Sequence, residues 1–149
     1  MKHAGIATLP VILLISGIVM ELTIAGVIIA SLITSTIFSE RLSAEALAAA
    51  RSGAQDAIVK IIRYNCSSFI SGCPSENPDS PDVVVLAENR TAEVYIAAKT
   101  PIGDGVRFTV SSVGIAATNK KKIEALVEVS ASSGKVSVVS FKEVPLPSQ

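Results

Sequence analysis

The sequence has no tryptophan and one histidine, and aromatic residues make up only 4% of it. A catalytic histidine would have to be His3, which lies in the first few residues ahead of a long apolar run. Thirteen basic and thirteen acidic residues give a formal net charge of zero. That balance gives no electrostatic reason to expect nucleic acid as the main partner. The sequence therefore supports no enzyme, and neither a cofactor nor a metal is expected.

Aliphatic side chains near the N-terminus are what the sequence has in excess. Apolar residues make up 49% of the 149 residues, and the mean hydropathy of +0.53 is high for a soluble domain. The 33 residues from Ile6 to Phe38 carry a single charge, that of Glu21. A bilayer core is crossed by about 20 apolar residues in a helix. We therefore expect residues 6–38 to form a transmembrane or assembly helix.

A cleaved secretory signal is the main alternative for this segment. The apolar core of such a signal is about 7–15 residues long and ends at small residues before the cleavage site. The run found here is more than twice as long, and it ends in Ile-Phe-Ser-Glu-Arg at residues 37–41, without a small-x-small site. The sequence therefore favours an anchor that is retained.

The helical pattern continues beyond the apolar run as far as Tyr64. Apolar residues recur at spacings of three and four and form one stripe: Leu47, Ala50, Ala54, Ile58 and Ile61. Polar residues fall on the opposite face: Arg41, Glu45, Ser52, Asp56, Lys60 and Arg63. No proline interrupts the chain between Val11 and Cys73. We expect residues 39–64 to be an amphipathic continuation of the same helix.

The rest of the chain is predicted to be a small sheet. Residues 65–82 form a Cys/Pro-rich loop, and residues 83–149 contain runs in which apolar and polar residues alternate. Turn signals at residues 103–105, 114–119 and 132–134 separate the runs, and connections this short require antiparallel neighbours. The pattern predicts a meander of four or five strands with one face covered by the amphipathic helix, which is an α+β fold.

Two runs carry more detailed expectations. In the first, four apolar residues are expected to share one face of the sheet: Ala92, Val94, Ile96 and Ala98. In the last, residues 136–141, the apolar face shifts midway, which indicates a bulge or an edge strand.

Six residues separate the two cysteines, Cys66 and Cys73. This spacing differs from a redox C-x-x-C motif, and zinc ligands are lacking. A disulfide here would indicate an oxidising compartment, while two unpaired thiols in a loop are the alternative. Lys2 and the terminal amine precede the apolar run, so the leader is expected to stay in the cytoplasm. The C-terminal domain is then expected outside the inner (cytoplasmic) membrane.

The order of a short leader ending in glycine, an apolar helix, an amphipathic helix, a loop and an antiparallel sheet resembles the type IV pilin family. The matching residues are Met-Lys-His-Ala-Gly at 1–5 and the run Ile-Ala-Thr-Leu-Pro-Val-Ile-Leu-Leu that follows. Within the family, residues 5–20, 44–61 and 110–129 are most similar to minor pilins of the PilX type and to minor pseudopilins of type II secretion.

The resemblance implies processing and assembly. A prepilin peptidase would cut between Gly5 and Ile6 and methylate the new N-terminal residue, Ile6. Other pilin-like subunits would then pack against the apolar helix, first in the membrane and finally in an extracellular filament, or fimbrium, at the cell surface. The alternative is a monomeric membrane-tethered binding module that does not polymerise.

Two residues bear on that assembly. Most pilins have a glutamate at the fifth position after the cut, which pairs with the N-terminal amine of a neighbouring subunit, and here this position is Pro10. The departure favours a minor, initiating or tip subunit. Glu21 is a lone carboxylate among apolar residues, and it costs several kcal/mol unless it is protonated, paired or near water. It could pair with a neighbouring subunit, hydrogen-bond within its own helix, or lie near the membrane surface.

Overall fold

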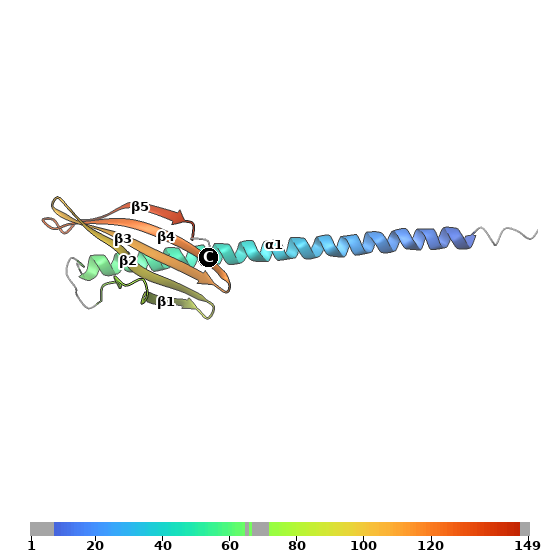
Figure 1. Ribbon diagram of the computed structural model, residues 1–149, viewed down its shortest axis with the longest axis horizontal. Coiled ribbons are helices and arrows are strands. Elements are labelled where there is room, and N and C mark those ends of the chain that lie inside the picture. The colour runs from blue at the N-terminus through green and yellow to red at the C-terminus, as the bar shows by residue number, and fades with distance from the viewer. Residues whose placement is uncertain (1–7, 65, 67–71, 147–149) are drawn as a thin grey trace, which may run out of the picture. The chain divides into compact units, whose positions relative to one another are not determined.

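The computed structural model describes residues 8–64, 66 and 72–146, so the expected cleavage and methylation residues, Gly5 and Ile6, lie outside the described residues. The elements are α1 (Thr8–Tyr64), β1 (Asp82–Ala87), β2 (Arg90–Ile102), β3 (Gly105–Ala116), β4 (Asn119–Ser130) and β5 (Val136–Val144). The chain divides into two compact units between Glu40 and Arg41. The second unit, called the head below, contains the sheet and the end of α1 (Figure 1).

The apolar segment, residues 8–38 of α1, is helical throughout, as the sequence predicts. Every large apolar side chain from Val11 to Phe38 is exposed, with exposed fractions between 49 and 68%. Five hydroxyls donate to backbone carbonyls three or four residues earlier, at 2.7–2.9 Å: those of Ser16, Thr23, Thr34, Ser35 and Thr36. These hydroxyls therefore need no water as a partner. By length and composition the helix could cross a membrane, although a signal sequence meets the same criterion.

In the head, the five strands form one antiparallel sheet in the order β1-β2-β3-β4-β5. The predicted α+β meander is therefore confirmed. One face of this sheet packs on α1 and forms the main core of the described residues: Ala57, Ile61, Cys66, Ala92, Val94, Ile96, Phe108, Val110, Ala125, Val127 and Val129. Figure 1 shows the strands lying across the last turns of the helix.

The helix contacts the sheet through small side chains. The most deeply buried are Ala46, Ala49, Ala50, Ala54, Ala57 and Ile61. Ala50, Ala54 and Ile61 belong to the predicted stripe, whereas Leu47 and Ile58 are only half-buried at its margin. The contact is therefore displaced to one side of the predicted stripe, onto alanines. Alanines let the two backbones approach more closely than leucine or isoleucine would.

Two glycines show how close that approach is. A Cβ on Gly114 of β3 would collide with the backbone of Ala46 and Ala50, and a Cβ on Gly53 would lie 2.6 Å from the Ala92 Cβ. The buried Ser112 hydroxyl donates a 2.8 Å hydrogen bond to the Ala50 carbonyl across the same interface. Helix and sheet therefore meet backbone to backbone, without room for larger side chains.

The sheet differs from the sequence-based expectation in three places. Ala98 is exposed, because the register shifts between Ile96 and Ala98 and turns it away from the core. The turn expected over residues 114–119 is shorter, since β3 runs to Ala116 and β4 starts at Asn119. β1 starts at Asp82, the last residue assigned to the loop, because Asp82 already pairs with Val94. The expected irregularity in residues 136–141 is confirmed, as β5 is an edge strand whose register shifts opposite Leu126 and Val127.

Candidate functional site

The apolar segment is the first candidate site, because its large apolar side chains from Val11 to Phe38 are exposed. Pro10 is the third residue of α1 and is exposed. A proline is tolerated there because the first turn of a helix has no carbonyl partner for its N–H groups. Pro10 is therefore compatible with the first turn of α1.

Glu21 is exposed on this segment, and within the described ranges no residue forms a hydrogen bond or ion pair with its carboxyl group. The hydrogen bond within its own helix that the sequence left open is therefore not observed. Gly17 and Ala25 lie four residues before and after Glu21, so they are its neighbours along one row of the helix surface. Nothing lies within 4 Å of the position of a Cβ on Gly17. The carboxylate is therefore open to an approaching group on that side.

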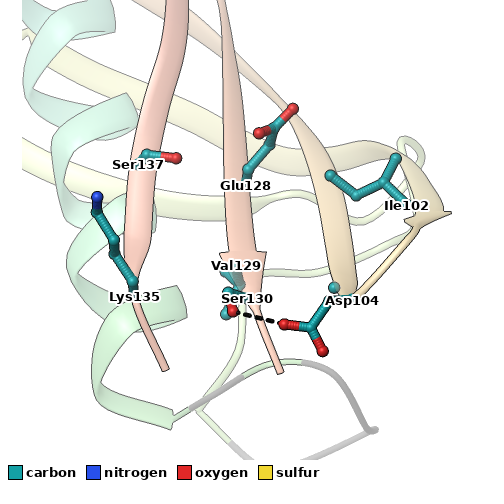
Figure 2. A pocket seen from close by; sticks show the side chains of 8 residues that line it. Ile102, Asp104, Glu128, Val129, Ser130, Lys135 and Ser137 are labelled. Atoms are coloured by element: carbon teal, nitrogen blue, oxygen red, sulfur yellow. Dashed lines mark hydrogen bonds between the residues drawn. The ribbon is translucent and has the colours of Figure 1, made fainter. Parts of the chain in front are cut away.

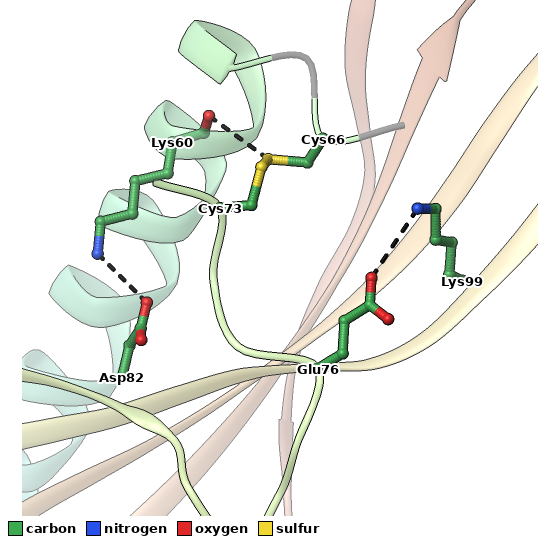
Figure 3. The surroundings of a disulfide bond; sticks show 6 residues. All are labelled: Lys60, Cys66, Cys73, Glu76, Asp82 and Lys99. Atoms are coloured by element: carbon green, nitrogen blue, oxygen red, sulfur yellow. Dashed lines mark hydrogen bonds and ion pairs between the residues drawn. A yellow bond between two sulfur atoms is a disulfide. The ribbon is translucent and has the colours of Figure 1, made fainter. Parts of the chain in front are cut away.

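The disulfide predicted between Cys66 and Cys73 is confirmed, with an S–S distance of 2.00 Å and 5.8 Å between the Cα atoms. Both cysteines of the sequence are used in it, so the alternative of free thiols is excluded. Figure 3 shows the bond beside the last turns of α1, where the Cys66 sulfur lies 3.8 Å from the Lys60 carbonyl oxygen. The disulfide thus ties the end of the helix to the segment that leads into β1.

Replacing both cysteines by alanine is expected to lower the free energy of unfolding of the head by about 2–3 kcal/mol, the chain-entropy value for so short a loop. Denaturant titration of the full chain in detergent measures this difference. Reductant should bring the wild type to the stability of the variant and leave the variant unchanged. Equal stability of the two proteins under oxidising conditions would show that the bond does not stabilise the head.

Ion pairs connect the same helix to the β1–β2 hairpin of the sheet. The Lys60 ammonium lies 3.0 Å from Asp56 and 3.5 Å from Asp82, and the Arg90 guanidinium lies 3.3 Å from Glu45 (Figure 3 shows Lys60 with Asp82). Burial alone would lower the pKa of Lys60, but the hydrogen bonds and charges of the two aspartates outweigh it and raise this pKa. The stabilisation is complete below the ordinary pKa of 10.5 and is lost as pH rises through the folded value.

A shallow cavity of about 260 Å³ lies where the β2–β3 and β4–β5 connections meet (Figure 2). Asp104 accepts hydrogen bonds from the hydroxyls of Ser132 and Ser130, which lower the pKa of this carboxyl. Lys135 and Glu128 also line the cavity. Over residues 8–64, 66 and 72–146, no three His, Cys, Asp or Glu side chains are grouped as metal ligands. The aspartate and serines bridge two connections, and we assign them a structural role.

The order of Asp56 and Lys60, four residues apart, predicts the ion pair between them, and that pair is confirmed. The sequence did not predict the cavity or the ion pairs Lys60–Asp82 and Arg90–Glu45, because these depend on which strand ends and helix faces meet. The only sequence signals nearby are the turn residues at 103–105 and 132–134.

Comparison of the chain with protein-family models, curated proteins and solved structures gives no match. What is known of the chain is therefore its architecture: a long N-terminal helix whose first part is apolar and whose last turns pack on an antiparallel sheet, and this architecture is pilin-like.

Proposed function

We propose that the chain is a structural subunit of a type IV pilus-like filament, a minor pilin or pseudopilin. It assembles through the apolar segment after prepilin peptidase has cut between Gly5 and Ile6. Subunits first reside in the inner membrane, with the head on the side away from the cytoplasm, and then enter the filament. In this proposal the membrane and the helices of other subunits are alternative environments for the same apolar surface.

The observation that carries the proposal is that the head buries apolar side chains of its own, whereas the apolar segment leaves its large apolar side chains exposed. The head has a buried core of its own, and the Cys66–Cys73 disulfide joins the end of its helix to the segment before β1. The apolar segment leaves all seventeen of its large apolar side chains between Val11 and Phe38 exposed. Full burial of such a side chain contributes about 1.5–3 kcal/mol, and these side chains are 49–68% exposed, so enclosing all seventeen gains roughly 15–30 kcal/mol. An exposed surface of this size needs lipid or other helices around it.

The disulfide supports the orientation. Disulfides persist in oxidising compartments and are rare in the cytosol. The Cys66–Cys73 bond therefore favours a head on the far side of the inner membrane, where a pilus-like filament also grows. The charge of the leader agrees with this orientation, since Lys2 is expected to remain in the cytoplasm.

Mass spectrometry of the N-terminus tests this proposal. The chain extracted from membranes should begin at Ile6 and carry one methyl group on its amine. A Gly5→Leu variant should keep its leader, whereas His3→Ala, a change within the leader but away from the cut, should be processed normally. An intact Met1 in the wild type would support a monomeric membrane tether, and a cut near residue 40 would support a secreted protein. Either result would contradict the proposal.

A further inference from the structure

The two edges of the sheet in the head carry exposed apolar side chains. On β1, Val83 is 59% and Val85 is 71% exposed. On β5, Val138 is 50% and Phe141 is 40% exposed. Edge strands also present backbone groups without a partner in the sheet, which makes such edges places of association.

The exposed valines of β1 lie on the face of the sheet that points away from α1. Val84 pairs with Ala92 and packs against the core, so it faces the helix. Its neighbours Val83 and Val85 must then point to the opposite face, because successive side chains of a strand alternate. We call this surface the outer β1 patch.

The exposed residues of β5 lie on the other face. Val138 pairs with Val127 and Phe141 pairs with Ala125, and both partners are fully buried in the core under α1. Directly opposed side chains share a face of the sheet, so Val138 and Phe141 face the helix side. They stay exposed because α1 does not cover them. We call this surface the inner β5 patch.

The two edges also differ in charge. Residues 75–89, which precede and include β1, carry four acidic side chains and no basic one: Glu76, Asp79, Asp82 and Glu88. Residues 131–146, which include β5, carry Lys135, Lys142 and Glu143. Glu143 is already 2.7 Å from the ammonium of Lys121. On the β1 side, Asp82 and Glu76 are likewise ion-paired within the head, at 3.5 Å from Lys60 and 3.9 Å from Lys99. The remaining charges are those of Asp79 and Glu88 at the β1 edge and of Lys135 and Lys142 at the β5 edge, so the first edge is acidic and the second is basic.

We propose that a second copy of this chain places its outer β1 patch against the inner β5 patch of the first, so that neighbouring heads overlap like roof tiles. Apolar patches on opposite faces of opposite edges meet when copies keep the same orientation, and the acidic edge then meets the basic edge. A two-fold contact would instead bring like edges together, with like charges opposed. The tile-like contact leaves one patch free on each copy and so repeats along an open assembly.

This inference goes beyond the proposed function, because it requires at least two copies side by side. It also names the head surfaces in contact. Both complementary patches occur on one chain, as a repeating contact between copies requires, whereas a subunit present once at a tip would use only one of them.

Cysteine cross-linking in membranes of the full chain tests the contact, because the native cysteines are bonded and leave no free thiol. Val85→Cys chains mixed with Val138→Cys chains should form a disulfide-linked dimer. Val59→Cys, a matched valine that is 57% exposed on α1, serves as the control partner. Because docking holds the two thiols at high effective concentration, the mixed pair should exceed either pairing with the control by about tenfold.

Val85→Cys or Val138→Cys linking efficiently to itself would indicate a two-fold contact and would overturn the inference. A mixed yield no higher than that of the Val59→Cys control would also overturn it. The N-terminal mass is read from the same samples. A methylated Ile6 without the cross-link rejects the tile-like contact alone, while a cross-link in a chain that keeps Met1 rejects the proposed processing alone.

Discussion

An Ala50→Leu chain is expected to have a head destabilised by about 3 kcal/mol, whereas Ala48→Leu, the same exchange two residues earlier, leaves the stability of the head unchanged. Ala50 is fully buried at the helix–sheet interface, and Ala48 is exposed on the same helix. A leucine at 50 meets the backbone of β3, which already approaches so closely that Gly114 has no room for a Cβ. Overpacking of a dense core costs about 1–3 kcal/mol and occasionally more, and backbone on both sides places Ala50→Leu at the upper end.

Denaturant titration of the full chain in detergent, followed by resistance of the head to protease, compares the two variants. The change in helix propensity is the same in the two variants, because both replace an alanine by leucine in the interior of α1. Gly114→Ala probes the interface from the strand side and should destabilise the head as well. Equal stability of Ala50→Leu and Ala48→Leu would show that helix and sheet are not packed backbone to backbone.

The second large effect is expected at Glu21. A Glu21→Leu chain should insert into the membrane as the wild type does and should fail to assemble into filaments. Insertion depends on the length of the uninterrupted apolar run, which the exchange increases. Assembly is impaired because the variant lacks the carboxylate that would pair with a polar group of a neighbouring subunit. Leaving a carboxylate unpaired in a membrane costs several kcal/mol, and satisfying it in the filament provides a comparable preference for assembly.

Filament yield after mechanical shearing, together with the amount of chain in the membrane fraction, measures both parts of this prediction. Ile24→Leu, an apolar exchange one turn further along the same helix, is the matched control and should assemble normally. Glu21→Gln separates charge from hydrogen bonding, since the amide keeps an acceptor. Unchanged filament yield for Glu21→Leu would remove Glu21 from the assembly mechanism.

Much of the fold follows from local patterns. The apolar run and the spacing of three and four predict one continuous helix, because a helix repeats every 3.6 residues and no proline intervenes between Val11 and Cys73. Alternation predicts the strands, and short connections force antiparallel neighbours. The disulfide follows from two cysteines close in sequence. Each of these features depends on residues near one another along the chain.

The remaining features depend on contacts between distant segments. Ala98 faces away from the core because one extra residue of β2 is accommodated against β3, and a periodic pattern gives no sign of that irregularity. The helix–sheet contact is centred on alanines, since the depth of packing is set by Gly114, more than fifty residues further along the chain. The opposite faces of the two edge patches likewise become visible only with the register of β1 and β5.

The candidate site shows the same division. Glu21 and Pro10 stand out in the sequence as a charge and a helix breaker in an apolar run. Their exposed side chains, in a segment that forms a compact unit separate from the head, are known only from the structure. Gly5 and Ile6 remain predictions from the resemblance to pilins.

Partitioning of the full chain is the most direct test of the central claim that the surface of residues 6–38 must be enclosed. Cells expressing the chain are fractionated, and the membrane fraction is washed with salt and then extracted with detergent. The chain should stay with the membranes through the salt wash and enter solution only with detergent, whereas a fragment of residues 41–149 should not need detergent. A full chain that stays monomeric in detergent-free buffer would contradict the account.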